Sequence, residues 1–79
     1  MTIRVFVNAA AVDVASGATA LDCVRRWRGE EGEAVAAGGR LITDSRGLPI
    51  PTDTPAQAGS IYRTIPNRTT GSAGEAARE

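Results

Sequence analysis

Residues 17–27, GATALDCVRRW, predict an amphipathic helix. Thr19 precedes the apolar positions and Asp22 follows it three residues later, a capping-box arrangement that satisfies free backbone N–H groups. Apolar side chains then recur at helical spacing and form one stripe, which consists of Ala20, Cys23, Val24 and Trp27. A helix this short is only marginally stable in water by itself. We therefore expect the stripe to pack on a sheet formed by the flanking segments.

The segment before this helix predicts a β-hairpin. Residues 2–8, TIRVFVN, alternate between two faces, and their β-branched side chains favour a strand. Residues 12–15 repeat the alternation after a short turn, and Ser16 with Gly17 ends the second strand. Phe6 falls on the face opposite the predicted core side. An aromatic side chain there covers its neighbours or marks a partner surface.

Two short strands are predicted on either side of a double glycine. Residues 28–33, RGEEGE, indicate a charged and solvated loop after the helix. Residues 34–37 suit a short strand anchored by Val35, and residues 40–43, RLIT, suit another. Because a Gly-Gly pair between two strands is typical of a hairpin, Gly38 and Gly39 are expected to form its turn.

Residues 44–59, DSRGLPIPTDTPAQAG, predict a long loop with turns. Proline lacks a backbone N–H and disrupts a regular strand ladder. A loop of this length in a small domain needs apolar contacts of its own. Leu48 and Ile50 are its large apolar residues, so they are expected to hold the loop against the core.

Residues 60–65, SIYRTI, predict the last strand, and the sequence leaves its buried face open. If Ile61 and Ile65 point inward, Arg63 between them points inward too, unless a bulge changes the alternation. Otherwise Tyr62 and Thr64 form the inner face.

The chain is predicted to contain one domain, residues 1–66, because 79 residues leave little surface for a second core. Residues 67–79 carry no large apolar side chain, so they are expected to form a disordered tail. The predicted core consists of Ile3, Val5, Val7, Val12, Val14, Ala20, Cys23, Val24, Trp27, Val35, Leu41, Leu48, Ile50 and Ile61.

Composition excludes several classes of function. Nine basic and nine acidic residues cancel, which argues against binding to nucleic acid or to an anionic membrane. One cysteine and no histidine exclude an internal disulfide and a Cys/His metal site, and no cofactor is expected. No stretch approaches the ~20 apolar residues of a membrane span, and no signal-peptide pattern opens the chain. A cytoplasmic protein is the expectation.

The order of the predicted elements resembles the β-grasp, or ubiquitin-like, family. The resemblance lies in TIRVFVN forming a hairpin with VDVASG, in GATALDCVRRW as the helix, and in AGSIYRTI as the closing strand. It is nearest to the small sulfur-carrier proteins of thiamin and molybdopterin biosynthesis. The resemblance implies an α+β fold in which a mixed sheet of four or five strands packs on one helix.

The carriers that the chain resembles end in Gly-Gly directly after the last strand. Their terminal carboxylate enters the narrow channel of an adenylating enzyme, where side chains would obstruct it. Here the last strand is followed by PNRTTGSAGEAARE, which contains no adjacent glycines. A carrier role would therefore require trimming of the tail, with Gly71 as the processed C-terminus.

Enzyme activity is not expected, because the chain has no histidine and Cys23 lies on the predicted buried stripe. The leading hypothesis is a non-catalytic protein-interaction module or a small subunit of a larger enzyme complex. Arginine and aromatic side chains are enriched at interface centres. The candidate binding residues are Arg4, Phe6, Tyr62 and Arg63. The alternative hypothesis is a sulfur-carrier or protein-modifier relative that an adenylating enzyme activates.

Overall fold

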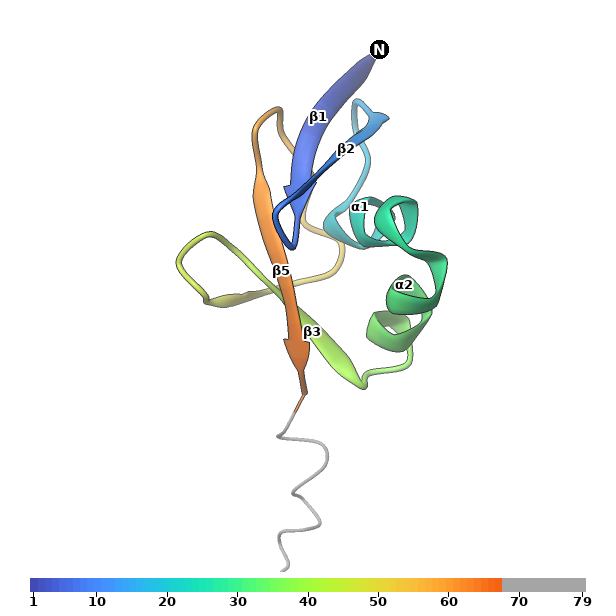
Figure 1. Ribbon diagram of the computed structural model, residues 1–79, viewed down its shortest axis with the longest axis vertical. Helices are drawn as coiled ribbons and strands as arrows, with labels where there is room; N and C mark the ends of the chain where they lie inside the picture. Colours follow the sequence, from blue (N-terminus) through green and yellow to red (C-terminus); the bar gives the residue numbers. More distant parts are fainter. Residues whose placement is uncertain (68–79) are drawn as a thin grey trace, which may run out of the picture.

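Five strands and two helices make up residues 1–67, the part of the chain that the computed structural model describes. In chain order they are β1 (Thr2–Val7), β2 (Ala10–Ala15), α1 (Ala20–Trp27), α2 (Gly29–Ala36), β3 (Arg40–Thr43), β4 (Pro49–Ile50) and β5 (Ile61–Pro66) (Figure 1). The helices lie together on one side of the sheet.

The strands form one mixed sheet in the order β2-β1-β5-β3-β4. β1 and β2 are antiparallel, with Thr2 facing Ala15, and β3 is antiparallel to both β4 and β5. β1 and β5 run parallel, so the first and last strands are neighbours inside the sheet. The predicted α+β class and the mixed sheet are confirmed, and two helices accompany the sheet where one was expected.

Helix α1 begins at the predicted capping box. The Thr19 hydroxyl accepts a hydrogen bond from the Asp22 backbone N–H at 3.2 Å, and the Asp22 carboxylate accepts one from the Thr19 N–H at 3.1 Å. Ala20, Cys23 and Val24 are fully buried, as the stripe predicted, and Trp27 packs at the margin of the core.

The predicted loop at 28–33 and the predicted strand at 34–37 are both wrong, because these residues form α2. Arg28 is extended (φ −152°) and separates the two helices, and its guanidinium lies 4.9 Å from the Trp27 ring centre. Glu30 and Glu31 occupy the first turn of α2, where negative charge suits the helix dipole. Val35 is buried as predicted, but it reaches the core from a helix.

The double glycine ends α2 and does not form a hairpin turn. The Gly38 N–H donates to the Val35 carbonyl and the Gly39 N–H to the Ala34 carbonyl, each at 3.0 Å. This is the Schellman pattern, in which the residue after the helix adopts a left-handed conformation that favours glycine. Gly38 has φ +89°. The pair therefore directs the chain from α2 into β3.

The segment 44–59 contains the two-residue strand β4 and is held mainly by its backbone. Leu48 is 53% exposed, so the expectation that it fixes the loop is wrong, whereas Ile50 packs on the core as expected. Ala56 is buried and its N–H donates to the Ala18 carbonyl at 2.8 Å. The Ala20 N–H donates to the Thr54 carbonyl at 2.8 Å. The loop thereby closes against the start of α1.

The open question about β5 is answered by its register with β1. Phe6 lies beside Ile61 and Val7 beside Tyr62, and neighbouring residues in such a pair share a face. Because Val7 is fully buried, Tyr62 and Thr64 point inward. Arg63 consequently points outward, and no charge is forced into the core.

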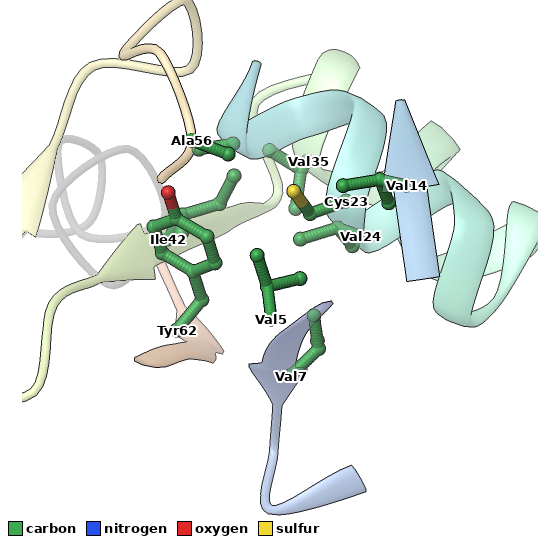
Figure 2. Packing of buried hydrophobic residues seen from close by; sticks show 10 residues of the cluster. Val5, Val7, Val14, Cys23, Val24, Val35, Ile42, Ala56 and Tyr62 are labelled. Atoms are coloured by element: carbon green, nitrogen blue, oxygen red, sulfur yellow. The ribbon is translucent and has the colours of Figure 1, made fainter. Parts of the chain in front are cut away.

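The core lies between the inner face of the sheet and the two helices. Figure 2 shows side chains of the sheet, of α1 (Cys23 and Val24) and of α2 (Val35) pointing toward one another.

The core prediction is wrong for Leu48 and Ile61, which are exposed, and for Leu41, which shares the outer face with Ile65. It misses three residues of the buried cluster, Ile42, Ala56 and Tyr62. The other predicted members are buried or pack at the margin: Ile3, Val5, Val7, Val12, Val14, Ala20, Cys23, Val24, Trp27, Val35 and Ile50.

Candidate functional site

The outer face of the sheet, turned away from both helices, carries a strip of apolar side chains. Side chains at i and i+2 of a strand share a face, so Ile61 and Ile65 project outward together with Arg63. Strand pairing adds one residue from each neighbouring strand, Phe6 beside Ile61 and Leu41 opposite Ile65. We refer to these five residues as the outer band.

Much of the outer band is open to solvent. Ile61 is 44% exposed and Ile65 is 38% exposed, and Phe6 and Leu41 are half-buried. A shallow hollow lined by Phe6, Ala9, Ile61 and Arg63 lies at one end of the band. Exposed apolar side chains that gather on one face are typical of interaction surfaces.

The arginines of this face differ in their partners. The Arg4 Nε lies 3.0 Å from the Asp13 Oδ1 across the β1–β2 pair. This hydrogen bond and the attraction between the charges raise the pKa of Arg4 and lower the pKa of Asp13. Within residues 1–67, Arg63 forms no ion pair. The outer band therefore offers a guanidinium that a partner's carboxylate can bind.

Three of the four candidate binding residues lie on the outer face, namely Arg4, Phe6 and Arg63. Tyr62 does not, because it is 4% exposed and points into the core (Figure 2). Its burial raises the pKa of the phenol. Gly71, the proposed processed C-terminus, lies outside the described residues.

A second cluster of polar side chains connects the turn between β1 and β2 with α2, β3 and β5. The Thr64 hydroxyl donates to the Glu31 carboxylate at 2.6 Å and accepts from the Asn8 side-chain amide at 3.0 Å. The Arg40 Nε lies 2.5 Å from the same carboxylate, and the Arg40 guanidinium also donates to the Thr64 carbonyl. The four residues are largely paired with one another, so they act as a structural link between α2 and the sheet.

Sequence reasoning missed this polar cluster. Its four members come from three distant parts of the chain, and Glu31 was assigned to a solvated loop. Thr64 is the residue that could have indicated this cluster, because a hydroxyl on the inner face of a strand needs a hydrogen-bond partner.

Residues 1–67 contain few side chains that could act as a nucleophile or bind a metal ion. Cys23 is fully buried, and burial raises the pKa of its thiol, so little thiolate forms at neutral pH. Within this range no three histidine, cysteine, aspartate or glutamate side chains gather to hold a metal ion. The outer band is thus the most developed candidate site on these residues.

Comparison of the chain with protein-family models, with curated proteins and with solved structures gave no match. Neither helix within residues 1–67 has the length and apolar character needed to cross a membrane.

Proposed function

We propose that this chain is a non-catalytic, ubiquitin-like module of the β-grasp type that binds another protein through the outer band. The fold part of the proposal is supported by the element order: an N-terminal hairpin, a capped helix on one face of the sheet, and a last strand beside the first. The partner is either a separate protein or the larger subunits of an enzyme complex.

The functional part of the proposal is based on the exposure of Ile61 and Ile65 on either side of Arg63, which forms no ion pair with any other residue in 1–67. Interface centres combine apolar area with arginine and aromatic side chains, and Phe6 supplies the aromatic ring. A partner that fits this surface presents apolar side chains around a carboxylate.

Affinity capture with a matched pair of variants tests the proposal. Ile61→Arg places a charge in the outer band, whereas Leu48→Arg places the same charge at an exposed apolar position outside the band. We expect a protein retained by wild type and by Leu48→Arg to be lost about tenfold or more from Ile61→Arg. Circular dichroism checks that both variants fold. Identical retention by all three proteins would refute the proposal.

The alternative proposal, a carrier or modifier activated at its C-terminus, is supported by the position of β5. This strand lies inside the sheet, and Asn67 directly after it is held by the carbonyls of Gly38 and Gly39. Intact-mass measurement on protein from native cells separates the two proposals. A species that ends at Gly71, or an adduct there, supports the carrier, and an unmodified chain ending at Glu79 supports the binding module.

A further inference from the structure

An open pocket of about 430 Å³ lies between the turn that joins β3 to β4 and the loop that leads into β5. The turn contributes Asp44 and Ser45 to its lining, and the loop contributes Thr54 and Pro55. A volume of this size is within the range of sites that bind small molecules. The pocket is therefore a candidate site for a ligand that is not a protein.

Both walls of the pocket are held by hydrogen bonds. On the side of the turn, the Asp44 carboxylate accepts from two backbone N–H groups, at 2.9 and 3.1 Å. On the side of the loop, the Ala56 N–H donates to the Ala18 carbonyl at 2.8 Å. The Gly59 N–H donates to the Arg4 carbonyl at 2.7 Å. Because the walls are already in place, a ligand does not have to order them when it binds.

The charge of the pocket favours a cation. Within residues 1–67, Asp44 is the one charged residue that lines it. The Asp44 Oδ1 accepts both backbone bonds, whereas Oδ2 accepts one bond, from the Arg46 guanidinium at 3.1 Å. Each carboxylate oxygen can accept two hydrogen bonds, so Oδ2 can accept another. The Arg46 side chain is 76% exposed, and an ion pair that is open to solvent is weak, so a ligand cation can compete with it.

The hydroxyl of Thr54 favours a hydrogen-bond donor. It donates its own proton to the Pro51 carbonyl at 2.7 Å, so its oxygen can only accept a bond from a ligand. A primary ammonium group combines a positive charge with three N–H donors, whereas a quaternary ammonium group has no N–H. The apolar part of the lining consists of Ile50, Pro55 and Ile61, which suits a ligand with an apolar body.

We propose that this pocket binds a small primary amine with an apolar body. The ammonium group binds the Asp44 carboxylate and the Thr54 hydroxyl, and the apolar body lies against Ile50, Pro55 and Ile61. Ile61 also belongs to the outer band, so the ligand lies at the border of the protein-binding surface. The proposal goes beyond protein binding and is tested separately from it.

The test titrates phenethylamine against the isotope-labelled full chain and follows the backbone amides by NMR. We expect saturable shifts at the amides of Asp44, Thr54 and Ser60, with a dissociation constant on the order of 1 mM, as is usual for so small a ligand. Phenethyl alcohol has the same body without a charge, and phenylacetate carries a negative charge on a similar body. Both should bind about fivefold or more weakly than the amine, because they lack the charged donor.

Asp44→Asn should weaken phenethylamine binding about fivefold or more and leave phenethyl alcohol binding unchanged. Asparagine keeps a side-chain oxygen that can accept the backbone bonds of the turn. Asp53→Asn is the matched control, because it removes an exposed carboxylate from the same segment but outside the lining. It should leave the binding of both compounds unchanged. Circular dichroism verifies that each variant is folded.

Two further variants test the site without changing Asp44. Arg46→Ala removes the competing guanidinium and should strengthen phenethylamine binding about twofold. Thr54→Val removes the second acceptor and should weaken phenethylamine binding about twofold or more. Thr54→Val keeps the proposal testable if Asp44→Asn does not fold.

Three results would overturn the proposal. One is the absence of saturable shifts with phenethylamine, and another is equal binding of the amine, the alcohol and the carboxylate. The third is equal binding of phenethylamine by wild type, Asp44→Asn and Thr54→Val. A lysine side chain of a partner protein carries the same ammonium group, so the peptide acetyl-Gly-Lys-Gly-amide is titrated as well. If this peptide binds more tightly than phenethylamine, the pocket serves a partner's lysine and the free amine is refuted.

Discussion

Thr64 joins three separate parts of the chain through one side chain. Its hydroxyl accepts from the Asn8 amide and donates to the Glu31 carboxylate, and its backbone N–H donates to the Asn8 side-chain carbonyl at 3.1 Å. Thr64 is itself buried. Removing the hydroxyl would leave polar groups of Asn8 and Glu31 without this partner, at a position where water has little access.

Thr64→Val keeps the shape of the side chain and removes its hydrogen bonds. We expect the free energy of unfolding to fall by about 1–3 kcal/mol, as is typical when buried polar groups lose a partner. Chemical denaturation followed by circular dichroism measures this change. Thr43→Val is the control, because the buried Thr43 hydroxyl has a longer bond of 3.4 Å, to the Arg63 carbonyl. Equal losses in the two variants would show that the cluster has no special role.

At the level of single residues, the sequence predicts local features better than long-range ones. The Thr19–Asp22 box and the buried stripe of α1 follow from spacing within one segment, and both are confirmed. The face of β5 depends on its pairing with β1, more than fifty residues away in the chain. The alternation in 60–65 admits both faces, because Ile61 and Tyr62 are both large and partly apolar.

Among the elements, α1 and α2 approach each other closely at Gly32. A Cβ at this position would lie 3.0 Å from the Arg25 Cα and 3.1 Å from the Arg25 Cβ. Gly32→Ala would raise the intrinsic helix propensity of α2. It would also force the two helices apart.

We expect the steric effect to exceed the propensity gain, so that Gly32→Ala lowers the free energy of unfolding by about 1–3 kcal/mol. The control is Gly29→Ala in the same helix, where an added Cβ meets nothing within 4 Å and stability should stay equal or rise. Thermal denaturation of both variants measures the difference. A stabilised Gly32→Ala protein would contradict the close approach.

The turn between β3 and β4 makes stability depend on pH through Asp44. Its carboxylate accepts hydrogen bonds from the backbone N–H groups of Leu48 and Arg46 and from the Arg46 guanidinium, which lowers the pKa of Asp44. A carboxyl group with a lowered pKa contributes stability above its unfolded-state pKa. That contribution disappears as the pH falls through the folded-state pKa.

Asp44→Asn should therefore be less stable than wild type at pH 7. The gap should close as the pH falls below about 4, where the carboxyl group of the unfolded chain becomes protonated. Melting temperatures of the two proteins between neutral and acidic pH measure the gap. A gap that stays constant over this range would contradict the assignment.

The sequence missed α2 because local propensity and tertiary contact conflict there. Gly29 and Gly32 disfavour a helix, and this weighed more than Glu30, Glu31 and the alanines that follow. In the folded chain Gly32 is the position that lets α1 approach, and the glycines at 38 and 39 form the cap. If Gly38 and Gly39 are interpreted as the end of a helix, the sequence predicts α2 before them.

At the scale of the whole molecule, the helices cover one face of the sheet and leave the other face open. Substitutions on the two sides can therefore be compared directly. Val24 is fully buried beneath the sheet, whereas Phe6 lies half-buried on the outer face. Val24→Ala should lower the free energy of unfolding by about 1–3 kcal/mol, and Phe6→Ala should lower it clearly less. Chemical denaturation of both variants measures the two changes in the free energy of unfolding. Equal losses would mean that the inner and outer faces of the sheet are assigned the wrong way round.

The overall class could be predicted because alternation and helical spacing identify the strands and the helix that share one core. The candidate surface could be predicted in part, since Arg4 and Phe6 follow from the alternation in β1. Arg63 is a correct candidate, but its face depends on the pairing of β5 with β1. Leu41 and Ile61 could not, because both are placed in the predicted core as large apolar residues, and the sequence leaves the face of Ile65 open. In a sheet with a solvated face, strand register decides which apolar residues remain outside.

The parallel pair of β1 and β5 has a consequence for biosynthesis. The Phe6 N–H donates to the Ser60 carbonyl and the Asn8 N–H to the Tyr62 carbonyl, so β1 reaches its final surroundings only after β5 has been made. A nascent chain that has emerged only through α2 lacks β3 and β5, so the apolar side chains that those strands cover in the complete sheet are still exposed. Chaperones that recognise exposed apolar segments have that interval in which to act, and any polypeptide that stops before residue 61 lacks the strand that closes the sheet.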